Sequence, residues 1–351
     1  MTRTYQRLYP VHFGNRTGYI DQHGEIVISP KPFLGHDFHD GFAVVEVPDH
    51  GEFAYGFLNE AGRIAIRARF LWADAFHEGF ARVELKHDCF SFVDPHGQPT
   101  PGNFTALRNF SEGLAAASTN GHWGYIDSSG QFVIQPGLLH AGQFSEGLAA
   151  ATVSGRAGFI DRTGKWAIKD NYEQAWPFRA GRAAVQINNF FGYIDRSEKW
   201  IVKPIFEFAW PHYEGLAHVV DAGGHGFIDL AGNSVAAPHF DDARDFSEGL
   251  AAVKVGKKWG YIDARGTLVI RPQFLEAEPF HHGIARVVVD EMVQTTEIAE
   301  THTENVERVP ICNYIDKVGQ TIWKWPSFFN NAPYPRDIGY RTPRAVTVGA
   351  A

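Results

Sequence analysis

Cysteine, long apolar runs and clusters of basic residues are all scarce in this sequence, and each absence excludes a class of protein. Cys89 and Cys312 are the only cysteines in 351 residues, so no disulfide framework is available, as is usual in a reducing compartment. No apolar run approaches the length of a membrane span. The first residues, MTRTYQRLYPVHF, lack the apolar core of a secretory signal. The sequence therefore predicts a cytoplasmic location and no membrane partner.

The charge balance argues against nucleic acid as a ligand. The chain has 32 Lys and Arg against 40 Asp and Glu, for a net charge of −8, and no basic run stands out. Neutralising phosphate groups requires clustered Lys and Arg. A nucleic-acid partner is therefore not expected.

The sequence is rich in a repeated strand–turn–strand motif. Its most regular copy is KWGYIDARGTLVI at residues 258–270, in which β-prone residues flank an Asp-x-x-Gly turn. The same core, including two looser copies, begins at Gly18, Gly56, Ser91, Gly124, Gly158, Gly192, Gly226, Gly260 and Asn313. From Gly124 to Gly260 the step is always 34 residues. The chain is therefore a tandem-repeat protein.

A second motif, Phe-x-Glu-Gly-x-Ala with variants, precedes every copy except the first. Its glycines are Gly41, Gly79, Gly113, Gly147, Gly181, Gly215, Gly249 and Gly283. One unit is predicted to be this motif, a strand, a short turn, the Gly-x-Ile-Asp strand, the Asp-x-x-Gly turn and a third strand ending near a proline. The high content of glycine and proline, 36 and 19 residues, suits such short strands and tight turns.

Each column that recurs between the repeats has a predicted physical role. In the Asp-x-x-Gly turn the glycine adopts a positive φ without steric cost, so Glu198, which replaces it after Asp195, predicts strain or an altered turn. The isoleucines should form the core, and the strand glycines should leave room for a neighbouring backbone or ring. The motif phenylalanines should anchor the linkers between units. Replacing one of them by Ala in mid-array should cost about 3–5 kcal/mol.

The repeat is irregular at two further places. The third copy carries Pro95, Pro99 and Pro101, and proline removes donors from a strand ladder, so the third strand of this copy should be short or absent. The step from Gly260 to Asn313 is 53 residues against the usual 34. The extra length is an acidic insertion, residues 290–310, which the repeat scaffold does not require.

The paired columns KWGYIDxxGxxVIxP and FSEGLAAV resemble the bacterial WG repeat family, also called KWG repeats. The resemblance covers roughly residues 13 to 326, between a lead-in at 1–12 and a tail or cap at 327–351. It implies an all-β repeat scaffold that often serves as an interaction module, with no catalytic residue or cofactor to transfer. Only Trp123 and Trp259 keep the tryptophan of the motif, which puts a uniform role for that column in doubt.

Two all-β architectures fit these repeats: an open superhelical, solenoid-like array of short antiparallel β-meanders, and a closed β-propeller. Propellers often close by completing one blade with strands from both termini. Here both termini carry the same half of the unit, and 34 residues is short for a four-stranded blade. The open array is therefore the favoured prediction, with the propeller as the alternative.

Two groups of residues are candidate contacts for a partner. Trp72, Trp176 and Trp210 lie just before the second motif, and Trp176 and Trp210 are 34 residues apart. If exposed, these rings could hold a partner or a sugar, whereas the alternative is that they pack between units. The acidic insertion contributes Asp290, Glu291, Glu297, Glu300, Glu304 and Glu307. It could receive a basic protein, or it could be a disordered segment or extended hairpin without a partner.

Catalytic and metal-binding patterns are weak. His39, His77 and His281 share a column that holds serine, arginine or tyrosine in other copies, and such variety is typical of a solvated turn and not of a metal site. The repeated carboxylates fit turn chemistry, and no phosphate-binding or nucleophile motif is present. The favoured hypothesis is a non-enzymatic scaffold whose partner is another protein. The alternatives are a carbohydrate or cell-envelope glycan binder, and an enzyme with no recognisable motif.

Overall fold

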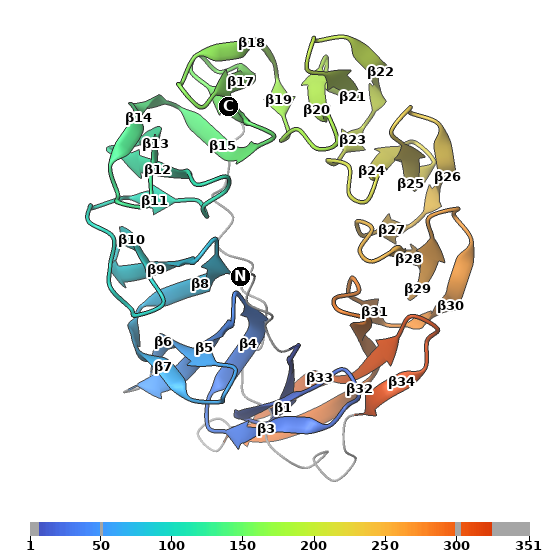
Figure 1. Ribbon diagram of the computed structural model, residues 1–351. Helices are drawn as coiled ribbons and strands as arrows, with labels where there is room; N and C mark the ends of the chain where they lie inside the picture. Colours follow the sequence, from blue (N-terminus) through green and yellow to red (C-terminus); the bar gives the residue numbers. More distant parts are fainter. Residues whose placement is uncertain (1–6, 50–51, 299–302, 325–351) are drawn as a thin grey trace.

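The computed structural model describes residues 7–49, 52–298 and 303–324, and all of its regular elements there are β-strands. The strands form nine antiparallel sheets, each built from one contiguous stretch of chain. The sheets stand as blades around a central opening, with the first strand of a blade nearest the opening and the last at the rim (Figure 1). The fold is a nine-bladed β-propeller.

Blade 1 has three strands, β1 (Tyr9–Phe13), β2 (Arg16–Ile20) and β3 (Ile26–Lys31). Blade 2 has β4 (Leu34–His39), β5 (Phe42–Asp49), β6 (Glu52–Asn59) and β7 (Ile64–Phe70). Blade 3 has β8 (Trp72–His77), β9 (Phe80–Lys86) and β10 (Cys89–Val93). Blade 4 has β11 (Ala106–Leu107), β12 (Ala115–Thr119), β13 (His122–Ile126) and β14 (Phe132–Leu138). Blade 5 has β15 (His140–Ser145), β16 (Leu148–Thr152), β17 (Ala157–Asp161) and β18 (Trp166–Tyr172).

The remaining four blades all have four strands. Blade 6 has β19 (Gln174–Ala175), β20 (Arg182–Ile187), β21 (Phe190–Asp195) and β22 (Trp200–Phe206). Blade 7 has β23 (Phe208–Ala209), β24 (Leu216–Asp221), β25 (Gly224–Asp229) and β26 (Ser234–Phe240). Blade 8 has β27 (Asp242–Ala243), β28 (Leu250–Val255), β29 (Lys258–Asp263) and β30 (Leu268–Phe274). Blade 9 has β31 (Glu276–Ala277), β32 (Ile284–Ile298), β33 (Thr303–Asp316) and β34 (Thr321–Lys324).

The ring is closed, so the favoured prediction of an open array was wrong. A 34-residue unit is long enough for a four-stranded blade because the inner strand is very short, only two residues in β27, for example. Closure also needs no blade shared between the termini. Blade 1, which begins at Tyr9 within the predicted lead-in, packs directly against blade 9.

The interior of each blade follows the predicted columns. The isoleucines of the Gly-x-Ile-Asp strand are all buried, as predicted: Ile20, Ile126, Ile160, Ile194, Ile228, Ile262 and Ile315. The strand glycine faces a bulge in the next strand, where the pairing register shifts between Trp259 and Tyr261. A Cβ atom on Gly260 would lie 2.4 Å from the carbonyl oxygen of Ile270. The predicted close backbone approach at this glycine is therefore confirmed.

The Asp-x-x-Gly turns also form as predicted. The Asp263 carboxylate accepts hydrogen bonds from the backbone N–H groups of Arg265 and Thr267, both at 2.9 Å. Where Glu198 replaces the glycine, the turn is unchanged, because Glu198 N still donates to Asp195 O at 3.1 Å. Glu198 has a φ of 63°, a left-handed conformation that costs a non-glycine residue energy. The residue is thus strained in an ordinary turn, and an altered turn does not occur.

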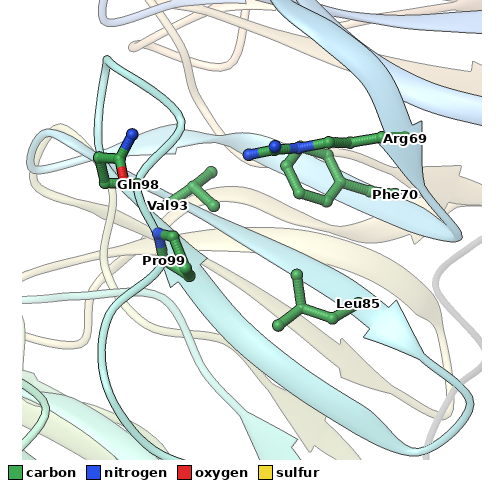
Figure 2. Close-up of a pocket in the computed structure, with 6 residues that line it drawn as sticks. All are labelled: Arg69, Phe70, Leu85, Val93, Gln98 and Pro99. Carbon is green, nitrogen blue, oxygen red and sulfur yellow. The ribbon is translucent and has the colours of Figure 1, made fainter.

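Proline erodes blade 3, as the sequence predicted. No fourth strand follows β10, and only isolated bridges join Val93 to Pro99 and Phe90 to Phe104. The segment that replaces the fourth strand leaves a pocket between blades 2 and 3, shown in Figure 2.

Aromatic pairs join consecutive blades. The phenylalanine of each Phe-x-Glu-Gly motif packs at a steep angle against the ring of the preceding blade's Gly-x-Ile-Asp strand, as in Phe144 on Tyr125 and Phe280 on Tyr261. The eight pairs, with ring centroids 4.5 to 5.0 Å apart, are Tyr19–Phe38, Phe57–Phe76, Phe92–Phe110, Tyr125–Phe144, Phe159–Phe178, Tyr193–His212, Phe227–Phe246 and Tyr261–Phe280. The predicted anchoring role of this column is confirmed.

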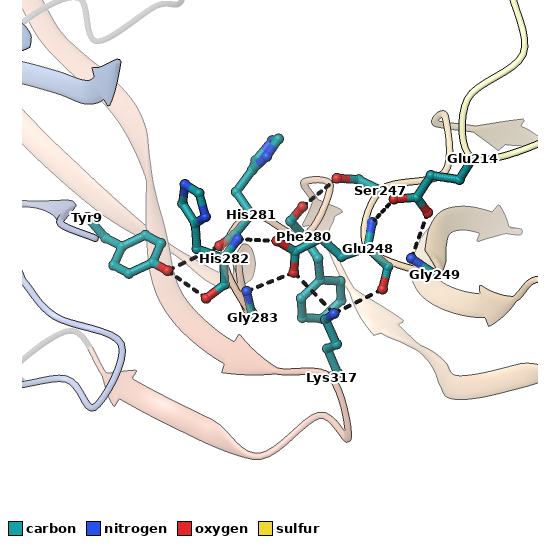
Figure 3. A network of polar contacts seen from close by, with 10 residues as sticks. All are labelled: Tyr9, Glu214, Ser247, Glu248, Gly249, Phe280, His281, His282, Gly283 and Lys317. Atoms are coloured by element: carbon teal, nitrogen blue, oxygen red, sulfur yellow. Dashed lines mark hydrogen bonds and ion pairs between the residues drawn. The ribbon is translucent and has the colours of Figure 1, made fainter. Parts of the chain in front are cut away.

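The glutamates of the same motif form a second link between blades, shown in Figure 3. Glu248 and Gly249 have φ values of 56° and 84° and form a two-residue hairpin turn. Both of their N–H groups donate to the Glu214 carboxylate of the preceding blade, each at 2.7 Å. Glu248 in turn accepts from the N–H of Gly283 at 2.8 Å in the next blade. The carboxylate offsets the cost of placing glutamate in a left-handed conformation.

Two tyrosines close the ring between blades 9 and 1. Blade 1 lacks an inner strand, just as the first repeat lacks the Phe-x-Glu-Gly motif. Tyr9 occupies the strand position that is Ala251 in blade 8, and its ring lies 5.7 Å from that of Tyr314. The Tyr9 hydroxyl donates to His282 O at 2.9 Å (Figure 3), and the Tyr314 hydroxyl donates to Pro10 O at 2.8 Å. These contacts replace the missing phenylalanine.

The junction between blades 6 and 7 departs from the pattern. Ala180 stands where most other blades have glutamate, yet it keeps the positive φ of 50°. His212 replaces the phenylalanine. Other contacts span this junction: the Arg179 guanidinium lies 4.5 Å from the Tyr213 ring, and Arg182 Nε donates to Leu230 O at 2.6 Å.

Ala180→Glu is expected to stabilise the protein. The new carboxylate would accept from the N–H groups of Glu214 and Gly215, as Glu214 does for the next turn, and should add about 1 kcal/mol to the free energy of unfolding. Urea denaturation measures this change. Ala180→Lys is the matched control, because it adds a long side chain without an acceptor. Equal stability changes in the two variants would contradict the role assigned to the carboxylate.

His212→Phe is expected to make stability less sensitive to acid. His212 is 4% exposed, and burial lowers its pKa to about 4 from about 6.5 in an unfolded chain. The folded state therefore disfavours the charged ring. Burial of the neutral His212 ring therefore costs no stability above pH 6.5. As the pH falls towards 4, the free energy of unfolding decreases progressively, by about 2–3 kcal/mol.

Urea denaturation at several pH values between 7.5 and 4.5 tests this. The His212→Phe protein should lose less stability on acidification than the native chain. Phe246→His, in the same column, is the reciprocal control and should lose more. If all three proteins lose the same amount, the buried imidazole is not the cause.

Candidate functional site

A row of three residues crosses the inner three strands of blades 2 to 9, and its chemistry changes from blade to blade. In blade 3, Arg82 donates to the Asp74 carboxylate at 2.8 Å. In blade 8, the Arg244 guanidinium lies 5.2 Å from the Trp259 ring. The members are cross-strand or diagonal neighbours on one face of the sheet. We call this set the variable row.

Blades 7 and 9 have different chemistry in the same row. In blade 7, Trp210 stacks on His218 with ring centroids 4.1 Å apart and planes 5° from parallel, and the rings of His218 and His225 are hydrogen-bonded at 2.8 Å. Burial lowers the pKa of His218 to about 3, so the His218 ring is neutral at neutral pH. In blade 9, Arg286 pairs with Glu278 and donates to Cys312 Sγ at 3.1 Å.

The variable row explains why the tryptophan column has no uniform role. Trp123 and Trp259 belong to it, as do Cys312 and His225. The row as a whole was not predicted. A signal was present, because complementary charges occur eight residues apart in two blades, at Asp74 and Arg82 and at Glu278 and Arg286.

The structure brings two of the three candidate tryptophans together. Trp176 and Trp210 are half-buried in adjacent blades, and Phe208 lies between them, with ring centroids 6.0 and 4.3 Å away. Trp72 begins β8 in blade 3, across the central opening (Figure 1). It is half-buried beneath the Arg82 guanidinium, 5.0 Å from its ring centroid.

A small pocket lies beside Trp210, at the inner ends of blades 7, 8 and 9. Its volume is about 290 Å³, and Trp210, His218, Arg244, Asp245 and Pro279 line it. Burial raises the pKa of Asp245 to about 6. The lining therefore combines one aromatic ring with groups of both charges.

The acidic insertion forms the outer part of a long hairpin. β32 and β33 pair continuously from Ile284 and Asp316 to Ile298 and Thr303, apart from one bulge after Val288. The neighbouring strands β31 and β34 pair only with the base of this hairpin. We call residues 290–298 with 303–310 the acidic ribbon.

The predicted acidic contacts lie along this ribbon, with one exception. Asp290 and Glu291 are exposed at its base. Glu297 and Glu304 are register partners near its end, and Glu307 is opposite Gln294. Glu300 lies outside the described residues.

The two faces of the ring differ in exposed apolar side chains. The Phe-x-Glu-Gly and Asp-x-x-Gly turns share one face, the motif face, where Arg162 donates to Glu112 O at 2.6 Å. The turns between second and third strands share the linker face with the linkers between blades, and Arg156 there donates to Asn171 O at 2.7 Å.

Exposed large apolar residues of the described chain are concentrated on the linker face and the outer rim. Those at the turns and linkers of the linker face are Phe53, Leu71, Leu85, Leu139, Val153, Phe190 and Val255. On the motif face of the described chain, Val318 is the one such residue within a turn, and Ile26, Ile64, Trp166 and Leu268 are exposed where the outermost strands begin. The acidic ribbon extends from the linker face, because it prolongs the second and third strands of blade 9.

The histidines and cysteines of the described chain form no metal-binding cluster. His39 and His77 approach each other with ring centroids 5.7 Å apart, but the described residues contain no group of three potential metal ligands. Burial raises the pKa of the Cys312 thiol, and Cys89 is also buried. Within the described ranges, no helix has the length and apolar character of a membrane span.

One comparison with a solved structure supports the fold, and two further matches are weaker. A crystal structure of a eukaryotic initiation factor has a TM-score of 0.59 and 10% identity, covering 90% of this chain and 95% of that one. AztD from Citrobacter koseri has a TM-score of 0.44 and 13% identity, covering 78% and 95%. BamB from Moraxella catarrhalis has a TM-score of 0.42 and 11% identity, covering 75% and 92%. At such identities the first of these shows a shared fold alone.

Sequence comparison identifies the family. No curated protein matches the chain. The family model for the WG containing repeat matches residues 18–31, 55–86, 123–156, 158–189, 191–222, 226–259 and 259–292. These segments span more than half of the chain and include parts of all nine blades. The resemblance noted from the repeat columns is confirmed, and the chain belongs to the WG repeat family.

Proposed function

We propose that this propeller is a non-enzymatic, cytoplasmic scaffold that binds another protein on its linker face, where the acidic ribbon receives a basic segment of that partner. The observation that carries the proposal is the asymmetry of the two faces. Exposed apolar residues such as Phe190 and Val255 gather on the face that also bears the ribbon. Apolar contacts supply affinity at interfaces, and charge supplies orientation and association rate.

The ribbon is suited to accept an extended segment. Beyond Asp290 and Ile311, β32 and β33 pair with each other and with no third strand in the described chain. Each therefore has an outer edge whose backbone groups can pair with a partner strand. Six acidic residues against one basic residue, Arg308, in positions 290–310 favour a partner rich in Lys and Arg.

Protein binding is better supported than carbohydrate binding. A sugar-binding tryptophan needs a free ring face, but one face of Trp210 is covered by His218 and Phe208 packs against the ring as well. Trp176 is similarly packed against Phe208. The variable row also supports a binding role, because it changes chemistry on a constant scaffold without assembling a nucleophile, base and anion-binding group in one place.

Site-specific photocrosslinking in cells tests the proposal. A benzophenone amino acid replaces Phe190 on the linker face or, as the matched control, Val318 on the motif face. The Phe190 position is expected to capture a discrete protein partner. Neutralising Asp290, Glu291, Glu297, Glu304 and Glu307 to their amides should abolish that product, since the basic segment would lose its counter-charge.

Two results would contradict this assignment. One is an equal yield of the same product from both crosslinking positions, which would remove the preference for the linker face. The other is a product that persists in the amide variant, which would exclude the ribbon as the receiving element. Urea denaturation of each variant shows that the ring itself is intact.

A further inference from the structure

We propose that the pocket between blades 2 and 3 binds small molecules that combine an apolar body with a carboxylate. The pocket has a volume of about 380 Å³, and Arg69, Phe70, Leu85, Val93, Gln98 and Pro99 line it. This volume is within the usual range of small-molecule sites. The pocket adjoins the one blade, among the nine of the described chain, in which prolines replace the fourth strand.

The floor of the pocket is apolar. Phe70 and Val93 are buried, and Leu85 is 41% exposed although it is a large aliphatic residue. Figure 2 shows Phe70, Val93, Pro99 and Leu85 around the same space. An apolar ligand that covers Leu85 would remove this surface from water, which is favourable.

The rim supplies one positive charge and one amide. The Arg69 guanidinium lies over the Phe70 ring, 5.1 Å from its centroid, and is directed towards Gln98 (Figure 2). Its Nη2 donates to Gly97 O at 2.7 Å, which holds the guanidinium at the rim and leaves its other N–H groups to bind an anion. No acidic residue is among the six that line the pocket.

The combination selects a ligand class. Guanidinium groups form strong, directional hydrogen bonds with carboxylates, and the amide of Gln98 can add a further donor. A neutral apolar molecule would leave Arg69 without an anion, and a small hydrophilic anion would leave Leu85 exposed. The geometry therefore favours amphipathic monocarboxylates over both.

Calorimetric titration with 4-phenylbutyrate tests the proposal on the full-length protein, with 4-phenylbutanol as the uncharged analogue. We expect saturable binding of the carboxylate and about tenfold weaker binding of the alcohol. Arg69→Gln should weaken carboxylate binding about tenfold, and Arg69→Lys should restore part of it. Arg63→Gln, at an exposed arginine outside the pocket in the same blade, should leave binding unchanged.

Leu85→Trp is a second test that does not depend on charge. The larger side chain would fill the pocket from an exposed position, so it should abolish binding of both compounds while thermal unfolding stays near that of the native protein. The proposal is overturned if 4-phenylbutyrate does not bind saturably, if acid and alcohol bind equally, or if Arg69→Gln has no effect. Neutralising the acidic ribbon should not alter this titration, so the two proposals stand or fail separately.

Discussion

The steep aromatic contact between consecutive blades is the interaction on which the ring depends. An isolated blade would expose apolar side chains on both sheet faces, and it can bury them only against its neighbours. The phenylalanine of each Phe-x-Glu-Gly motif, or His212 in blade 7, fixes how closely consecutive blades approach, with centroid distances of 4.5 to 5.0 Å in eight junctions. Because the junctions are alike, each blade is rotated by a similar angle relative to the one before it. The array of blades must then either close into a ring or continue as an open superhelix. Tyr9 and Tyr314 supply the ninth contact and close it.

The roles of residues that recur in every repeat could be predicted from the sequence, whereas closure of the ring, which depends on residues that occur once, could not. The roles of the isoleucine, phenylalanine and glycine columns follow from their recurrence, because one physical constraint acts nine times over. Closure depends on Tyr9, which stands where other blades have alanine. Tyr9 occurs once in this column, so the sequence does not show that its ring contacts Tyr314 of blade 9. The inner strand was also hidden, since two residues such as those of β27 have no periodicity to recognise.

The candidate site was predictable only in part, for a related reason. Trp176 and Trp210 were recognised as equivalent because they recur at the repeat length. The variable row was missed because the residue types at its three positions differ between blades. These positions hold Trp210, His218 and His225 in one blade and an ion pair in another. Chemical similarity between copies reveals columns that serve the fold. The columns of the variable row differ between copies, so recurrence does not reveal them, and the available signal is the pair of opposite charges eight residues apart in blades 3 and 9.

The hydrogen bonding of the motif face supports our proposal that a partner binds on the opposite face. At the Phe-x-Glu-Gly turns, the backbone N–H groups and the carboxylates bind each other from blade to blade, as Glu214 and Glu248 do. Arg162 and Lys317 are also occupied there, donating to backbone carbonyls of the preceding blade. A substitution that created a binding contact on this face would break a junction. The linker face carries fewer such constraints, so it can bear an inserted ribbon, exposed apolar residues and an eroded blade while the ring stays closed.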